Sequence, residues 1–133
     1  MIYLLDTHTL IWSIVESSKL SPAAREIIEN RNNKIIVSTV SFWEISLKTA
    51  LKKFTFFGVD IESIPVFAKE LGFSFLPLES GDSISLHKLP AEDSHKDPFG
   101  RMIIWQAICG KYTLISKDSA FRRYEEQGLK LLW

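Results

Sequence analysis

The chain has 133 residues, the length of one globular domain, and 46% of them are hydrophobic, which excludes an intrinsically disordered protein. Its 16 lysine and arginine residues balance 16 aspartate and glutamate residues, which argues against nucleic-acid binding through bulk positive charge but leaves a local basic patch possible. The single cysteine, Cys109, excludes an internal disulfide and a multi-cysteine zinc site.

The N-terminal segment predicts a cytoplasmic protein. An acid stands at position 6, with no basic region and no long apolar run around it, so we expect no signal peptide. No apolar run approaches the length of a transmembrane helix, and we expect no membrane association. One cysteine in the chain fits a reducing compartment.

The predicted elements alternate between short apolar strands and helices. In chain order they are a strand at 2–5, a helix at 21–31, a strand at 34–38, helices at 41–53 and 60–72, a strand at 73–78, helices at 81–89 and 98–110, a strand at 112–116, a helix at 119–128 and a strand at 129–133. This order predicts an α/β protein, a three-layer α/β/α sandwich around a parallel sheet of short strands, in a single domain over residues 1–133. The aromatic segment KKFTFFG, residues 52–58, is predicted as a loop whose exposure would need a functional reason.

Residues 95–107, HKDPFGRMIIWQA, contain a predicted helix start and one unexpected residue. Asp97 followed by Pro98 is a helix-start signal, because the carboxylate accepts hydrogen bonds from free N–H groups and proline fits the first helical position. A carboxylate three residues after the cap would suit the helix dipole. Gly100 stands there instead, although glycine costs a helix about 1 kcal/mol relative to alanine.

Four acids are expected together at the carboxyl edge of the sheet. Asp6 directly follows the first strand and Asp118 follows the fourth, so two central parallel strands would project both from one edge. Asp97 caps the helix that leads into the fourth strand. Glu44 falls at the border of the apolar stripe of its helix, which directs its carboxylate toward the core.

Carboxylates that converge in one place repel each other unless a cation lies between them. Oxygen ligands select hard cations, so a cluster of Asp6, Glu44, Asp97 and Asp118 predicts a Mg²⁺ or Mn²⁺ site. Such ions act on phosphates by activating water and offsetting charge on the leaving oxygen. Lys48, Arg101 and Lys117 are candidates for contacts with phosphate, although the sequence favours ordinary surface charge for each of them taken alone.

Each acid also has a purely structural interpretation. Asp6, Asp97 and Asp118 can each cap a following helix, and Glu44 can pair with Lys48 one turn later. The histidines give no metal-binding pattern of their own. Cys109 is expected to pack in the core.

Five segments together resemble the PIN-domain toxins of the VapC type, in order and in spacing over nearly the whole chain. They are LLDTHTLIW, SFWEISLKTALKKF, HKDPFGRMIIWQA, LISKDSAF and LKLLW. The resemblance implies a PIN-like fold, a Mg²⁺- or Mn²⁺-dependent endoribonuclease and a homodimer. It also implies a cognate antitoxin that covers the active site.

Carried over by position, the resemblance makes Asp6, Glu44 and Asp118 catalytic metal ligands. Ser116 matches a position where the family often has serine or threonine beside the acids. The chain departs at Gly100, where the family reads a second acid in Asp-Pro-Phe-Asp-Arg, while Asp97 remains. We therefore expect weakened metal affinity and weakened cleavage.

Two other functions stay open at this point. A PIN-fold protein disabled by Gly100 would act mainly by binding its antitoxin or RNA. An acid-cluster phosphatase or phosphoacceptor domain is the third possibility, although an aspartate-nucleophile phosphatase would need an acid where His8 stands. The sequence contains no nucleotide-binding glycine motif.

Overall fold

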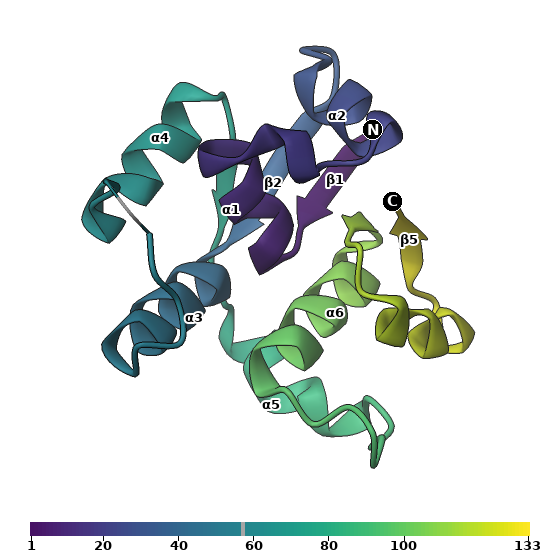
Figure 1. Ribbon diagram of the computed structural model, residues 1–133. Helices are drawn as coiled ribbons and strands as arrows, with labels where there is room; N and C mark the ends of the chain where they lie inside the picture. The colour runs from purple at the N-terminus through teal and green to yellow at the C-terminus, as the bar shows by residue number, and fades with distance from the viewer. Residues whose placement is uncertain (57) are drawn as a thin grey trace.

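The structure, a computed structural model, describes residues 1–56 and 58–133 (Figure 1). Phe57, in the predicted aromatic loop, lies outside the described residues. The chain forms a parallel sheet with helices on both faces, as the sequence predicts. No helix in the described part of the chain is long and apolar enough to cross a bilayer.

The sheet has five parallel strands in the order β3-β2-β1-β4-β5. These strands are β1 (Ile2–Leu5), β2 (Lys34–Ser38), β3 (Ser74–Leu76), β4 (Thr113–Ile115) and β5 (Lys130–Leu132). The chain builds outward from β1 to β3 and then returns to the other side of β1 with β4. Strand order therefore reverses between β1 and β4, the position at which open parallel sheets bind ligands.

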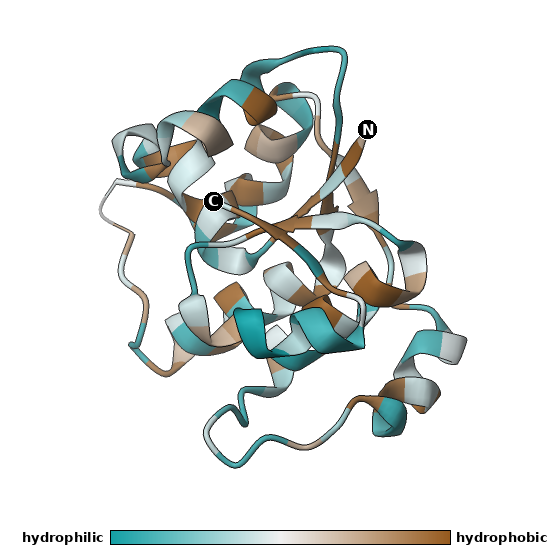
Figure 2. Ribbon diagram, turned by 90° about the vertical axis from the view of Figure 1, so that its right-hand side faces the viewer, coloured by the Kyte–Doolittle hydropathy of each residue, from teal (hydrophilic) through white to brown (hydrophobic). Residues whose placement is uncertain are grey.

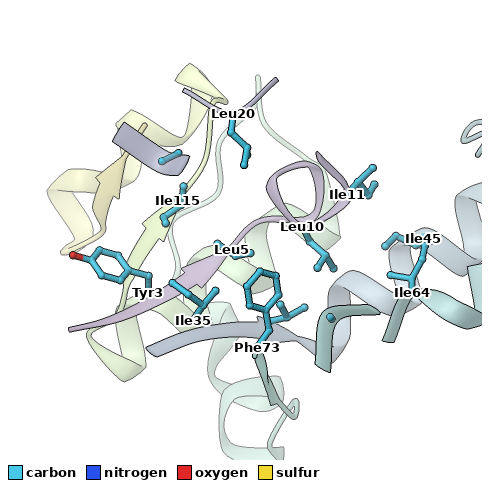
Figure 3. Close-up of a cluster of buried hydrophobic side chains, with 13 residues drawn as sticks. Tyr3, Leu5, Leu10, Ile11, Leu20, Ile35, Ile45, Ile64, Phe73 and Ile115 are labelled. Atoms are coloured by element: carbon cyan, nitrogen blue, oxygen red, sulfur yellow. The ribbon is translucent and has the colours of Figure 1, made fainter. Parts of the chain in front are cut away.

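Alternating side chains of the strands feed two separate cores. On one face, Tyr3 and Leu5 pack with α1 (Thr7–Val15), α2 (Pro22–Glu29) and α4 (Ile64–Glu70), and Figure 3 shows this cluster. On the other face, Leu4 packs with α6 (Pro98–Gly110) and the 3₁₀ helix η4 (Ser119–Gln127). Burying both faces explains why the strands are continuously apolar.

The remaining helices surround the carboxyl edge and the rim of the sheet. They are α3 (Thr39–Ala50), α5 (Ser80–Ser85), η1 (Ser17–Lys19), η2 (Ile61–Ser63) and η3 (Leu86–Lys88). Figure 2 shows the sheet strands coloured mainly as hydrophobic and the outer turns mainly as hydrophilic. This is the distribution expected for a sheet covered on both faces.

Three features differ from the sequence predictions. The sequence pattern predicts no helix at α1, whose segment THTLIWSIV is rich in β-branched residues that lower helix propensity. The predicted helix at 119–128 is a 3₁₀ helix, and it ends at Gly128 with φ +99°. Cys109 is exposed, because α6 buries Ile103, Ile104 and Ala107 on its other side.

Candidate active site

Two of the predicted acids lie at the ends of adjacent central strands. Asp6 directly follows β1 and Asp118 lies three residues after the end of β4, and these strands pair in register from Tyr3 with Thr113 to Leu5 with Ile115. The backbone N–H of Asp6 donates to the carbonyl of Ile115 at 3.2 Å, which extends the ladder one residue past β1. The sheet thereby places both acids at its reversal point.

Asp6 is a buried carboxylate that accepts one hydrogen bond at each of its two oxygens. It caps α1, with Oδ1 accepting from the Thr9 N–H at 2.8 Å, and its Oδ2 accepts from the Ser116 hydroxyl at 2.5 Å. Burial raises the pKa of Asp6 above its ordinary value, and the hydrogen bonds from Ser116 and Thr9 offset part of that rise. Among the described residues Asp6 has no ion-pair partner, so a cation at this edge would stabilise its charge.

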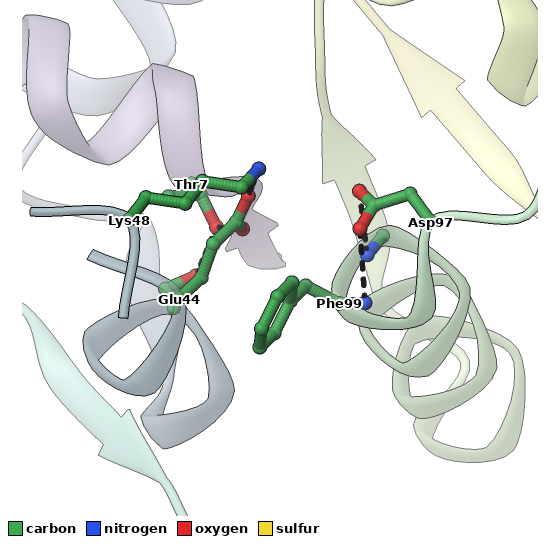
Figure 4. A network of polar contacts seen from close by, with 7 residues as sticks. Thr7, Glu44, Lys48, Asp97 and Phe99 are labelled. Carbon is green, nitrogen blue, oxygen red and sulfur yellow. Dashed lines mark hydrogen bonds and ion pairs between the residues drawn. The ribbon is translucent and has the colours of Figure 1, made fainter. Parts of the chain in front are cut away.

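Glu44 is buried on α3 and faces α1 across the carboxyl edge. Its Oε1 accepts from the Thr7 hydroxyl at 2.6 Å, and its Oε2 pairs with the Lys48 ammonium (Figure 4). The Lys48 ammonium also lies over the rings of Phe54 and Phe99, at 5.3 and 5.7 Å from their centroids. The expected surface pair of Glu44 and Lys48 is present, but it faces the site instead of bulk solvent.

Asp97 approaches from the opposite side, at the start of α6 (Figure 4). Its two carboxylate oxygens accept from the backbone N–H groups of Phe99 and Gly100, each at 3.2 Å. The side chain is half-buried. Asp97 therefore caps its helix while it also borders the site.

Asp118 is exposed and caps η4 by accepting from the Ala120 N–H at 2.9 Å. The Ser116 hydroxyl accepts from the Asp118 backbone N–H at 3.1 Å while it donates to Asp6. One buried serine therefore connects the first and last acids of the site. Ser116 supports the carboxylates and does not itself line the pocket.

One pocket of about 330 Å³ brings the acids together. Its lining includes Asp6, Glu44, Asp97, Asp118, Lys48, Lys117, Gly100, His8 and Trp12. In the described part of the chain, however, no three His, Cys, Asp or Glu side chains are grouped closely enough to hold a metal ion. The donor chemistry fits a hard cation, but the coordination shell is incomplete.

Gly100 borders this pocket and contributes no side chain to it, which accounts for part of the incomplete coordination shell. A Cβ atom at this position would lie 3.0 Å from Asp97 Oδ2, 3.4 Å from Phe121 Cζ and 3.5 Å from His95 Nε2. Only Asp97, a side chain at the pocket rim, would have to shift, by a few tenths of an ångström. A Cβ can be accommodated at position 100 with that small shift, so contacts at the Cβ position do not require glycine here.

Arg101 lies outside the pocket lining and holds backbone and side chains together. Its guanidinium donates to the carbonyls of Pro90 and Leu89, at 3.0 and 3.1 Å, and to the Tyr124 hydroxyl at 3.0 Å. The Tyr124 hydroxyl also lies 2.8 Å from His95 Nδ1, and both aromatic side chains are buried. Sequence reasoning did not find this network, because its members are far apart in the chain.

We expect Arg101→Gln to lower the free energy of unfolding by about 1–3 kcal/mol, because the Leu89 carbonyl and the Tyr124 hydroxyl, both in buried residues, lose their donor. Urea denaturation measures this change. Arg122→Gln is the matched control: its guanidinium is exposed and pairs with the exposed Glu125, so its loss should change stability by less than about 0.5 kcal/mol. Equal effects of the two substitutions would refute the structural role of Arg101.

Comparisons with known proteins agree with this fold. The family model of the PIN domain matches residues 3–127. A search of curated proteins gave no match.

Solved structures share the fold at low sequence identity. VapBC2 from Rickettsia felis, bound to a promoter DNA fragment, is 18% identical with a TM-score of 0.70, covering 99% of this chain and 98% of that one. VapBC-1 from nontypeable Haemophilus influenzae is 17% identical with a TM-score of 0.59, covering 99% and 97%. FitAcB from Neisseria gonorrhoeae is 16% identical with a TM-score of 0.59, covering 100% and 97%.

Proposed function

The chain belongs to the PIN-domain family, and from its pocket we propose that it is a metal-dependent endoribonuclease, the toxin of a toxin–antitoxin pair. The observation that carries this proposal is the gathering of Asp6, Glu44, Asp97 and Asp118 around one pocket at the reversal point of the sheet. Oxygen donors at such an edge suit Mg²⁺ or Mn²⁺, which when bound would supply positive charge to activate water at a phosphodiester.

The protein's own residues would have distinct tasks at this site. Asp6 and Glu44 would hold the cation from the sheet side, with Asp97 and Asp118 at the rim. Glu44 now pairs with Lys48, so a cation at Glu44 would release the ammonium to contact a phosphate oxygen. Lys117, also in the pocket lining, would provide a second phosphate contact.

A second candidate function is supported by the incomplete coordination shell. With glycine at position 100 and no three potential ligands grouped in the described residues, the chain would act mainly by binding its antitoxin or RNA. The VapBC and FitAcB neighbours support an antitoxin partner. We also propose a homodimer in the cytoplasm, as the sequence resemblance implies.

We expect the chain to cleave RNA in Mn²⁺ and to lose that cleavage in EDTA. Asp118→Asn should reduce cleavage by at least about 10-fold, because it removes a carboxylate charge from the pocket rim. Gel analysis of a labelled RNA measures this effect, with a generic phosphomonoester as the test for phosphatase activity.

Asp60→Asn is the matched control, because Asp60 caps the 3₁₀ helix η2 just as Asp118 caps η4, but outside the pocket. Cleavage that survives EDTA, or that falls equally in both variants, would reject the proposed site. Turnover of the phosphomonoester in place of RNA would favour the phosphatase alternative.

A further inference from the structure

Five aromatic rings form a row that passes the carboxylate pocket. In order they are Trp133, Trp12, His8, Phe54 and Phe56, and neighbouring ring centroids lie 5.8, 5.7, 5.7 and 5.9 Å apart. They come from three separate parts of the chain: its last residue, α1, and the segment after α3. We call this set the aromatic row.

The middle of the aromatic row lies in the pocket itself. His8 and Trp12 line the pocket together with Asp6 and Asp118. The His8 side chain is exposed, whereas Trp12, Phe54, Phe56 and Trp133 are half-buried and pack against the hydrophobic core. The hydrophobic core therefore supports four of the five rings, while the His8 ring stays exposed beside the acids.

Two lysine ammonium groups lie over rings of the aromatic row. The Lys117 ammonium lies 5.9 Å from the Trp12 ring centroid, and the Lys48 ammonium lies 5.3 Å from that of Phe54. Both lysines line the same pocket as the acids. Aromatic faces that hold bases, beside cations that hold the backbone, form the surface that proteins use for single-stranded nucleic acids.

We propose that the aromatic row is a base-stacking subsite that holds unpaired nucleotides next to the phosphate to be cleaved. It deepens the proposed function, and it rests on RNA being the substrate. Bases in a duplex are covered on both faces by their neighbours, so an exposed ring such as His8 accepts only a base that has left the stack. The site therefore selects single-stranded RNA over double-stranded RNA.

RNA binding in EDTA tests this inference without cleavage. Fluorescence anisotropy of a labelled unpaired RNA should show His8→Ala binding about 5- to 100-fold more weakly than the unchanged chain, the effect of losing one stacked base. His8→Phe should restore the affinity, because the ring returns without the imidazole nitrogens. The same RNA closed into a duplex should bind more weakly to the unchanged chain.

Trp43→Ala is the matched control. Trp43 is 60% exposed on α3 and packs edge-on against Phe99, but it belongs neither to the aromatic row nor to the pocket lining. Equal RNA affinity for His8→Ala and Trp43→Ala would overturn the proposal and leave the row as a surface for a protein partner. Equal affinity for duplex and unpaired RNA would overturn it as well.

Binding and cleavage separate this inference from the proposed function. Suppose that RNA binding requires the ring at position 8 while no variant cleaves RNA in Mn²⁺. The base-stacking subsite is then supported as an RNA-binding surface, and the nuclease proposal is refuted. If RNA is cleaved but the affinity for RNA does not depend on that ring, the nuclease proposal is supported and the base-stacking subsite is refuted.

Discussion

Gly100→Asp should raise Mn²⁺-dependent RNA cleavage by about 100-fold or more. The substitution adds a carboxylate to a pocket that Asp6, Glu44, Asp97 and Asp118 already line. Charge stabilisation by a bound cation contributes several kcal/mol to such reactions, and each 1.4 kcal/mol corresponds to a factor of about ten. A single-turnover assay of a labelled RNA, with the two chains at equal concentration, measures the gain.

The fold can accept this change. A Cβ at position 100 would press only on Asp97 Oδ2, at 3.0 Å, and a carboxylate in the first turn of α6 is favoured by the helix dipole. Because Asp97 also lies close to the new side chain, two carboxylates would share this corner of the pocket. Their repulsion increases the demand for a cation, so we expect Gly100→Asp to bind Mn²⁺ more tightly as well.

Gly100→Asn and Gly100→Ala are the controls for this experiment. Asparagine has nearly the shape of aspartate without its charge, and alanine supplies only the Cβ. If either variant raised cleavage as much as aspartate, the gain would come from helix stabilisation and not from a metal ligand. If Gly100→Asp cleaved no faster than the unchanged chain, then Asp97 would already serve in its place.

Asp6→Asn should abolish cleavage and at the same time stabilise the fold at neutral pH. The buried carboxylate has a raised pKa because burial disfavours its charge. Asparagine keeps the acceptor that caps α1 and carries no charge. We expect cleavage to fall by at least about 100-fold, and thermal denaturation at pH 7 to show a gain in stability of about 0.5–2 kcal/mol, the range typical of a single stabilising substitution.

The sign of the pH dependence follows from the direction of the pKa shift. The native state binds a proton at Asp6 more tightly than the unfolded chain does, so this stabilisation is complete below the ordinary pKa of 3.8. It is lost as the pH rises through the raised native pKa. The melting temperature of Asp6→Asn should therefore exceed that of the unchanged chain by more at pH 7 than at pH 4.

Asp118→Asn is the control for the stability effect, because Asp118 is exposed and its charge is already solvated. Added Mn²⁺ should raise the melting temperature of the unchanged chain and leave that of Asp6→Asn nearly constant, since a ligand stabilises only the state that binds it. A lower melting temperature for Asp6→Asn at pH 7 would show that the carboxylate charge contributes more through its hydrogen bonds than its burial costs.

The parts of the fold that follow from local pattern were predictable. The strands predicted at 2–5 and 34–38 agree residue for residue with β1 and β2. A short continuous apolar run bounded by polar residues is the pattern expected for a strand of a sheet that is covered on both faces. α1 was missed because tertiary packing buries a segment whose own residues do not favour a helix. The sequence also predicted that the Glu44 carboxylate is directed toward the core, from its place at the edge of the apolar stripe, and the structure buries it.

The candidate site was predictable in its members and less so in its distances. Asp6 and Asp118 share an edge because β1 and β4 are adjacent parallel strands, an adjacency that the chain pattern alone does not give. The role of Arg101 could not be read from sequence, since its acceptors include Leu89, Pro90 and Tyr124 in other segments. The aromatic row was equally hidden, because its rings meet only after the C-terminus returns beside α1.

The central position of β1 also sets the order of events during synthesis. The Ser116 hydroxyl that holds Asp6 lies 110 residues further along the chain. A chain made from its N-terminus therefore carries an unpaired β1 edge until β4 has left the ribosome. A product interrupted before that strand has Asp6 but lacks Ser116 and Asp118, so strand order delays assembly of the pocket until β4 has been made.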